Sequence, residues 1–431
     1  MCGQDNEKHE WQPPQAAVAL DNDPNADEAF PWDQGSVYDA HCHPTDTMAS
    51  LKAIAGMGAA TLTVMSTRAQ DQDLVASLGK EDPKVVPAFG WHPWFSYQLY
   101  DDHGKGGDNL VSLNDKRRHL ASVLVPSPSS LDEPTTDKDK QLVAALDALA
   151  ASLPAIRPLS AFIADTRQRL LDHPGALVGE IGIDKAFRVP EPAVGDKDSD
   201  KTSPCTVSGL TPGGREGRRL SPFRVQPAQQ TAVLAAQLRL AAELQRPVSV
   251  HGVQAHGLLF STLAATWKGQ EKKLLSHRQR RQIAGIEGLD DETSDSETDD
   301  DDDNGPKKPK KEKTYPPAIC LHSFSGPVDM LQQYLNPAIP ATIYFSFSTA
   351  VNCSTTNGCQ RTAEVVAACP DDRLLVESDL HGAGAPMDAA LEDMYRRLCA
   401  MKKWTLTEGV KKIGQNYDTF IQKTKRIKGR P

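Results

Sequence analysis

The sequence has no pair of cysteines separated by two residues and no regular cysteine framework, although the 431-residue chain contains eight cysteines. A disulfide scaffold needs such a framework, so we expect reduced thiols and a location in the cytosol or the nucleus. Cys42, Cys320 and Cys369 lie in or beside apolar patterns, where a thiol behaves as a small buried apolar group.

Long apolar runs are also missing. No stretch of 18 apolar residues occurs, so we expect no transmembrane helix. The first 14 residues are polar and lack the apolar core of a secretory signal.

Two signatures of nucleotide and nucleic-acid binding are absent as well. The glycines of residues 211–217 do not stand between a strand and a helix, as a phosphate-binding loop requires. There is no platform of alternating aromatic and basic residues of the kind that holds single-stranded nucleic acid. The net charge is −9, but ten carboxylates fall within residues 290–303, and the rest of the chain is close to neutral. Charge therefore predicts no broad attraction to nucleic acid and leaves a local basic groove open.

What the sequence does contain is a series of eight short apolar runs that alternate with helical patterns. We predict strands at residues 36–41, 61–66, 84–91, 175–182, 247–251, 318–322, 342–347 and 373–378. Between the first two strands we predict a helix at residues 46–58, where apolar residues recur at helical spacing. Their nearly continuous apolar character is typical of parallel strands, which are buried on both faces. The alternation predicts an α/β fold, namely a (β/α)8 TIM-type barrel with long loop insertions. We expect a disordered leader at residues 1–33 and a single barrel over residues 34–431.

Three insertions interrupt this pattern. Residues 97–140 and 188–224 each lie between a strand and its helix, so we expect them on the face that carries the active site. The second is rich in Pro, Gly, Lys and Arg and could bring positive charge to the rim of that site. Residues 270–315 lie between a helix and the next strand, on the opposite face, and join an acidic run to a basic one. We expect this segment to be disordered, and a solvated loop is favoured over nuclear import or partner binding.

Five of the predicted strands end on residues that can bind a metal ion. These residues are His41, His43, Glu180, His251, His322 and Asp379. Each has a plain alternative, because a lone histidine is often structural, a buried glutamate can form a salt bridge and an aspartate often caps a helix. A barrel, however, builds its active site at the carboxyl ends of its strands. The joint placement therefore predicts one metal centre made by all six side chains.

The predicted chemistry follows from the bridging capacity of a carboxylate. Glu180, midway around the barrel, is the candidate bridge between two divalent ions about 3.5–4 Å apart. The other five ligands divide between the ions, with His41, His43 and Asp379 at one and His251 and His322 at the other. Such mixed ligands suit Zn, Mn or similar ions better than Ca. Two such ions lower the pKa of water toward about 7 and so supply hydroxide, and Asp379 could orient that water and accept its proton.

Taken in order, these residues lie in motifs that resemble the TatD family of metal-dependent hydrolases, within the amidohydrolase superfamily. The motifs are DAHCHP, GWHPW, GEIGID, QLRLAAELQRPVSVH, LHSFSGP, VESD and IGQNYDTF, spread over residues 36–424 outside the insertions. The resemblance implies a TIM-type barrel that hydrolyses phosphodiester bonds in DNA with two divalent metal ions (Mg, Mn or Zn). It also implies that His92 contacts the substrate phosphate or supports the site, whereas the residues alone fit packing in an aromatic rim equally well.

The chain departs from the family pattern at two places. The family often carries an arginine shortly after the histidine of the fifth strand, where this chain has Gly252, Val253 and Gln254. A proline commonly follows the aspartate of the eighth strand by two positions, where this chain has His381, which could bind phosphate or replace a turn residue. The missing arginine bears on substrate preference more than on metal binding. The acidic and basic insertion and the long loops are similar to the fungal branch of the family, some members of which are described as partners of a cell-cycle ubiquitin ligase subunit.

Three functions stay open at this point. The first is a divalent-metal-dependent phosphodiesterase, a deoxyribonuclease acting on DNA ends or single strands. The second is an amide or lactone hydrolase of the same superfamily. Many of those enzymes use a carboxylated lysine as the bridge, so Glu180 in that place favours phosphoester chemistry. The third is an interaction protein of the cell-cycle machinery that keeps its metals structurally and binds a partner through residues 270–315.

Overall fold

The computed structural model describes residue 25 and residues 27–192, 219–273 and 312–422. Its centre is a set of eight strands: β1 (Tyr38–Cys42), β2 (Thr61–Met65), β3 (Val85–Ala88), β7 (Val178–Asp184), β9 (Val248–Val253), β10 (Ala318–Leu321), β11 (Thr342–Phe347) and β12 (Leu374–Val376). Neighbouring strands pair in parallel, in the orders β1-β2-β3 and β12-β11-β10-β9-β7.

Backbone hydrogen bonds join the two sheets on both sides. Between β3 and β7, Ala88 and Leu177 form a parallel bridge, and the Phe89 amide donates to the Leu177 carbonyl at 3.0 Å. Just beyond β12, the Asp379 amide donates to the carbonyl of His41 in β1, also at 3.0 Å. The strands therefore follow one another around a ring in chain order, and the predicted (β/α)8 barrel is confirmed.

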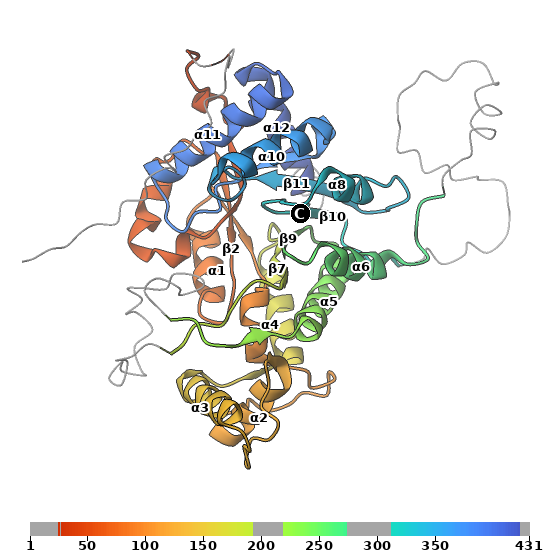
Figure 1. Ribbon diagram of the computed structural model, residues 1–431. Coiled ribbons are helices and arrows are strands. Elements are labelled where there is room, and N and C mark those ends of the chain that lie inside the picture. Colours follow the sequence, from red (N-terminus) through yellow and green to blue (C-terminus); the bar gives the residue numbers. More distant parts are fainter. Residues whose placement is uncertain (1–24, 26, 193–218, 274–311, 423–431) are drawn as a thin grey trace, which may run out of the picture.

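Helices lie between successive strands and around the ring (Figure 1). They are α1 (Gln72–Glu81), α4 (Leu159–Asp172), α5 (Pro227–Glu243), α6 (His256–Trp267), α8 (Val328–Tyr334), α9 (Thr349–Asn352), α10 (Thr356–Ala368), α11 (Ala385–Lys402) and α12 (Leu406–Phe420). Thr355 and Thr405 precede α10 and α12, and each side chain accepts a hydrogen bond from the amide three residues on. Such caps satisfy amides that the first turn of a helix leaves unpaired.

The segment after β1 differs from the helix that the sequence predicts over residues 46–58. It forms 3₁₀ turns, η2 (Pro44–Asp46) and η3 (Met48–Gly56). The Ser50 hydroxyl donates to the Thr47 carbonyl at 2.7 Å, and such local side-chain bonds compete with the α-helical pattern.

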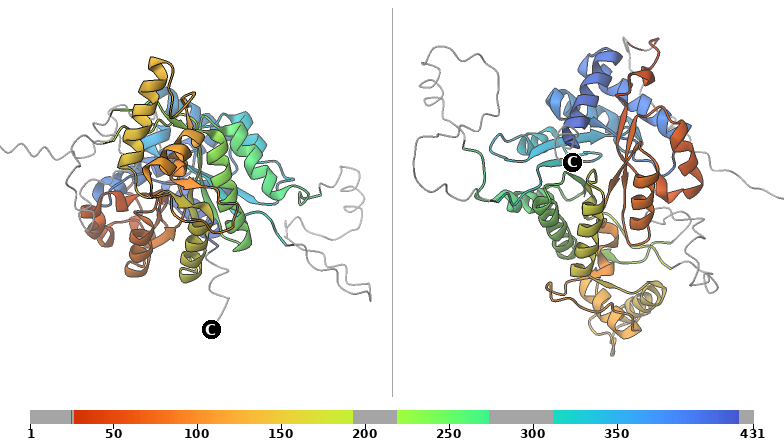
Figure 2. Two further views of the ribbon diagram at one scale, coloured as in Figure 1. Left: turned by 90° about the horizontal axis from the view of Figure 1, so that it is seen from below. Right: turned by 180° about the vertical axis from the view of Figure 1, so that it is seen from behind.

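A small lobe stands at one end of the molecule. It contains η4 (Pro93–Gln98), β4 (Leu99–Tyr100), α2 (Leu113–Val123), β5 (Leu124–Val125), α3 (Asp137–Ser152), β6 (Arg157–Pro158) and β8 (Arg224–Val225). β5 pairs antiparallel with β8, and Leu120 and Leu146 share an apolar cluster with Phe187 and Phe223. In Figures 1 and 2, α2 and α3 lie at the end of the molecule away from α11 and α12. Segments that come before and after β7 in the sequence therefore build one lobe.

Three predicted segments fall partly or largely outside the described residues: the leader at 1–33 and the insertions at 188–224 and 270–315. Their assignment, with the predicted limits of the barrel, stays a prediction. Within the part of the chain that the structure describes, none of the helices combines the length and the apolar character needed to span a bilayer.

Candidate metal centre

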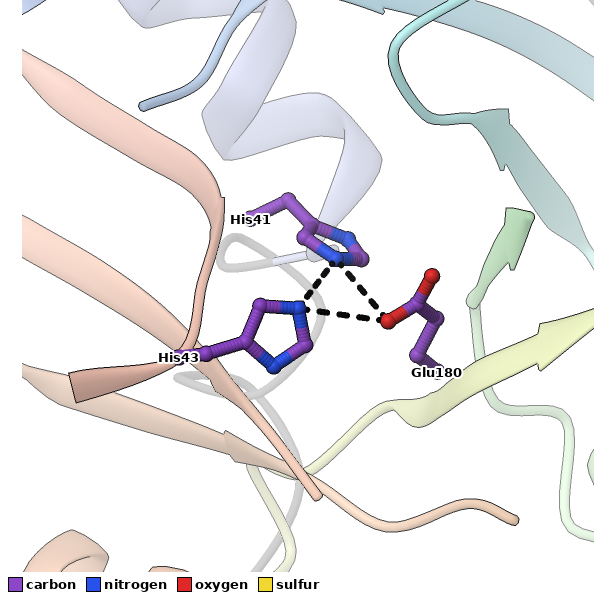
Figure 3. A group of neighbouring side chains, drawn as sticks. All are labelled: His41, His43 and Glu180. Carbon is purple, nitrogen blue, oxygen red and sulfur yellow. Dashed lines mark hydrogen bonds and ion pairs between the residues drawn. The ribbon is translucent and has the colours of Figure 1, made fainter. Parts of the chain in front are cut away.

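The site is built around Glu180, a residue of β7 that is only 3% exposed. Its Oε2 lies 3.2 Å from His43 Nε2 and 3.4 Å from His41 Nε2. The two imidazole nitrogens are 3.2 Å apart, so the three atoms form a triangle (Figure 3). Both histidines come from the carboxyl end of β1. Two nitrogens and one oxygen thus converge on one point.

The other oxygen of Glu180 faces a second group of imidazoles. This Oε1 lies 2.8 Å from His322 Nε2, 2.9 Å from His251 Nδ1 and 3.0 Å from His92 Nε2. The His251 and His322 nitrogens are 3.1 Å apart. His251 lies in β9, and His322 and His92 follow β10 and β3. One carboxylate therefore divides five imidazoles into two groups, one at each oxygen.

Asp379 and His381 lie at the side of this cluster, after β12. Asp379 Oδ1 is 3.8 Å from His43 Nε2 and 3.9 Å from His41 Nε2. Its backbone adopts a left-handed φ of +54°, which a short polar side chain tolerates better than a branched one. The His381 side chain is 45% exposed, and its Nδ1 lies 3.1 Å from Asp46 Oδ2. Asp379 is close enough to share an ion with the first histidine pair, whereas His381 stays at the rim.

The cluster opens into a pocket of about 230 Å³. Seven of the eight predicted site residues line it: His43, His92, Glu180, His251, His322, Asp379 and His381. The eighth, His41, is fully buried and reaches the cluster through His43 and Glu180. Thr67, Trp94 and Val351 complete part of the wall. The structure thus brings all eight residues to one place, and the roles assigned to each stay predictions.

Three further side chains orient the histidines, and the sequence analysis did not single them out. Ser249 Oγ lies 2.8 Å from His41 Nδ1, and Asp184 Oδ2 lies 3.4 Å from His251 Nε2. Glu377 is fully buried, and its Oε1 lies 3.5 Å from His322 Nδ1. Each of these side chains faces the ring nitrogen that points away from Glu180, which is the position of the outer partners of metal-bound histidines. The sequence does contain a signal for Glu377, because this charged residue lies in the apolar run 373–378, as Glu180 lies in the apolar run 175–182.

The close packing of imidazoles around Glu180 shifts the pKa values of the site residues. Burial raises the pKa of Glu180, but His92, His322 and His41 outweigh burial and lower that pKa well below its usual value. Burial lowers the pKa of His43, but its contact with Glu180 raises that pKa to about 9. Burial lowers the pKa of His92 to about 4. The carboxylate is therefore ionised, and His92 stays a neutral imidazole at neutral pH.

The donor set fits divalent cations. Among the described residues, three groups have ligand atoms within 4.8 Å of one another: His41–His43–Glu180, His41–His322–Asp379 and His92–Glu180–His251. At 3.1–3.2 Å the two nitrogens of each close imidazole pair are too near for both to carry a proton. A nitrogen without a proton turns its lone pair toward an oxygen of Glu180, and a bound cation would relieve this repulsion. Imidazole and carboxylate together are ligands for zinc and related ions. These groups differ from the predicted division, because His92 lies with Glu180 and His251, and His322 lies with His41 and Asp379.

Comparison with known proteins identifies the family. The model of the family described as TatD related DNase matches residues 38–422. The chain belongs to this family. A relative from Schizosaccharomyces pombe, the Cut9-interacting protein scn1, is 37% identical over 390 residues, which cover 90% of this chain and 99% of that protein. An uncharacterized deoxyribonuclease of Saccharomyces cerevisiae is 24% identical over 398 residues, which cover 89% of this chain and 98% of that protein.

Two solved structures also match the chain, at lower identity. The TatD homolog YJJV of Escherichia coli matches with a TM-score of 0.43 and 18% identity, covering 89% of this chain and 97% of that one. An uncharacterized amidohydrolase of Saccharomyces cerevisiae matches with a TM-score of 0.45 and 13% identity, covering 88% and 93%. The chain is therefore a TatD-family hydrolase, and its clusters of histidine and acidic side chains could hold metal ions.

Proposed function

We propose that the protein is a divalent-metal-dependent phosphodiesterase, a deoxyribonuclease of the TatD type. The observation that carries the proposal is the geometry of Glu180, whose two oxygens face separate groups of imidazoles at 2.8–3.4 Å. A carboxylate placed in this way can bridge two ions about 3.5–4 Å apart, which is the spacing of two-metal sites that cleave phosphodiesters. The pocket that Glu180 lines has a volume of about 230 Å³, which leaves room for a phosphate group with its ester oxygens.

Six residues would hold two ions: His41, His43, Glu180, His251, His322 and Asp379. When bound, such ions supply Lewis acidity and make water a nucleophile at neutral pH. Asp379 lines the pocket, and its Oδ2 lies 3.5 Å from the Ser323 hydroxyl, which fixes the carboxylate. In this account Asp379 orients the attacking water and accepts its proton.

The two other predicted residues take different parts. Both ring nitrogens of His92 are engaged, because Nε2 faces Glu180 and Nδ1 accepts a hydrogen bond from the Trp94 amide. This arrangement favours support of the site over direct contact with the substrate. His381 has an exposed imidazole at the rim, so it is the better candidate for binding a substrate phosphate.

Release of nucleotides from end-labelled single- and double-stranded DNA, with Mg, Mn or Zn supplied in turn, tests the proposal. We expect metal-dependent cleavage that Glu180→Gln and Asp379→Asn abolish. Glu364→Gln, a change of an exposed carboxylate on α10, is the matched control and should cleave like wild type. Metal-loaded wild type that cleaves no DNA with any of the three ions contradicts the proposal.

His381→Ala separates substrate binding from metal binding. A charge-assisted hydrogen bond to phosphate contributes about 1.5 kcal/mol, so its loss should raise KM about tenfold. The metal content should stay at the wild-type level, because His381 Nδ1 contacts Asp46 and not Glu180. Equal KM values for the variant and wild type would exclude this role.

We further propose that the protein binds a protein partner, because its relative from Schizosaccharomyces pombe is named for interaction with Cut9. The test is co-purification of the chain with a purified Cut9-type protein, using wild type and a variant in which a flexible linker replaces residues 274–311. The flanking residues should be kept, because Gln270 Nε2 donates to the Glu312 carbonyl at 3.1 Å and the Lys272 amide donates to the Ala338 carbonyl at 2.8 Å. Lost binding with unchanged unfolding temperature supports docking through this segment. Failure of wild type to bind contradicts the proposal.

A further inference from the structure

Two buried thiols meet beside the pocket, outside the metal centre. Cys353 directly follows α9, and Cys359 lies in the first turns of α10. They are 3% and 5% exposed, and the Cys353 thiol donates to Cys359 Sγ at 2.8 Å. A disulfide bond is about 2.05 Å long, so the sulfur atoms need to approach by only about 0.8 Å.

A positive charge faces one of the two sulfur atoms. Arg397 of α11 is 4% exposed, and its Nη1 lies 3.9 Å from Cys359 Sγ. The hydrogen bond from Cys353, with help from Arg397, lowers the pKa of Cys359 below its usual value against the opposing effect of burial. Burial instead raises the pKa of Cys369 to about 12. Since the thiolate is the reactive form, Cys359 is the nucleophile of the pair.

We propose that Cys353 and Cys359 are a redox modification site that forms a reversible disulfide with a peroxide as the oxidant. The Cys359 thiolate attacks one peroxide oxygen, the O–O bond breaks, and Cys359 becomes a sulfenic acid while the other oxygen leaves with a proton. The Cys353 sulfur then attacks the sulfenic sulfur, the S–O bond breaks, and water leaves with the Cys353 proton. The two sulfur atoms together lose two electrons, and the two peroxide oxygens gain them.

The position of the pair connects it with the wall of the metal pocket. Asn352 and Gly358, which precede the two cysteines, line a second pocket of about 150 Å³, which is large enough for a peroxide molecule. Val351 lines both this pocket and the metal pocket. Asp393 accepts hydrogen bonds from Thr349 of α9 and from Arg397 at 2.8 and 2.9 Å. Oxidation removes the charge that Arg397 faces and ties the end of α9 to α10.

Peptide mass spectrometry on the full-length wild-type protein tests this site. The protein is treated with hydrogen peroxide, alkylated and cut with trypsin and chymotrypsin. These proteases release residues 348–361, a peptide that contains Cys353 and Cys359 and no other cysteine. We expect this peptide to become about 2 Da lighter through loss of two hydrogens, to resist alkylation and to regain both thiols with dithiothreitol.

Three variants sharpen the result. Cys353→Ser should stop at a sulfenic or higher acid on Cys359, and Cys359→Ser should leave Cys353 alkylatable. Cys369→Ser, which changes a buried thiol of high pKa, should form the disulfide like wild type. The inference is overturned if the wild-type peptide keeps two alkylatable thiols after peroxide treatment, or if it gains oxygen on Cys359 without losing the two hydrogens.

Discussion

At the scale of single residues, Glu377 offers the sharpest test of how the imidazoles are held. Its carboxylate accepts hydrogen bonds from the Ser323 amide at 2.8 Å and the Ser323 hydroxyl at 2.5 Å, and it faces His322 Nδ1. We predict that Glu377→Gln weakens binding of Zn or Mn by roughly 10–100-fold, because the outer partner of a metal-bound histidine sets its orientation and basicity. Isothermal titration calorimetry measures the loss, and Glu364→Gln is the control. Equal affinities in wild type and variant would show that Glu377 only packs the core.

The buried carboxyl group of Asp71 predicts how the stability of the protein changes with pH. Its carboxylate accepts hydrogen bonds from the Thr67 amide and hydroxyl at 2.8 and 2.6 Å. Burial raises the pKa of Asp71 from 3.8 to about 6, so the folded state keeps a proton that the unfolded state loses between these values. The stability that this group contributes is therefore fully present below pH 3.8 and is lost as pH rises through about 6.

The substitution Asp71→Asn isolates the effect, because an amide side chain does not titrate. The unfolding free energy of metal-free wild type, minus that of the variant, should fall by about 3 kcal/mol between about pH 3.5 and pH 7.5. Urea unfolding at the two pH values measures this difference. A difference that does not change with pH would mean that Asp71 titrates normally.

The sequence was sufficient to bring the eight predicted site residues together, because each lies in a strand or shortly after one, and parallel strands end at one rim. It did not point to Asp184 or Ser249, whose contacts with His251 and His41 join residues more than 60 positions apart. Nothing in the local pattern around Ser249 distinguishes it from any other small strand residue. Glu377 could have been found from the sequence, because it is a charged residue within an apolar predicted strand, and this is the reason Glu180 was selected.

At the scale of secondary-structure elements, the close approach of β7 and β9 depends on Gly182. This residue has a φ of +154°, and an added Cβ would clash with the carbonyl oxygen of His251. We predict that Gly182→Ala destabilises the protein by about 3 kcal/mol and weakens metal binding, because it separates Glu180 from His251. Thermal unfolding and metal titration measure the two effects.

Gly257→Ala is the matched control. Gly257 lies in α6, where an added Cβ meets no atom within 4 Å, and alanine is favoured over glycine in a helix by up to about 1 kcal/mol. The control should therefore be as stable as wild type or slightly more stable. A Gly182→Ala protein with wild-type stability would contradict the account of this strand pair.

Periodicity predicted the eight strands within a few residues, because buried parallel strands are nearly continuous apolar runs. The lobe was not predicted as a unit. Its core joins Tyr97 and Leu146 to Phe223, residues separated by up to 126 positions, and this pairing leaves no local signal. The 3₁₀ turns after β1 were missed because the apolar spacing of residues 48–56 resembles that of an α-helix.

At the scale of the whole molecule, the metal centre joins strands from both sheets of the barrel. Its predicted ligands lie in or directly after β1, β7, β9, β10 and β12. An ion that binds only the folded state stabilises it in proportion to the logarithm of its concentration over Kd, about 2.7 kcal/mol at a hundredfold excess. The barrel and its site are therefore expected to gain stability together when metal is bound.

The number of divalent ions bound per chain tests the central claim most directly. The protein is equilibrated with Zn or Mn, dialysed and analysed for metal, with wild type beside Glu180→Gln and the control Glu364→Gln. We predict about two ions per chain in wild type and in the control, and at most about one in Glu180→Gln, because the bridging carboxylate serves both ions. Folded wild type that retains no ion, or Glu180→Gln with the metal content of wild type, would contradict a centre bridged by Glu180.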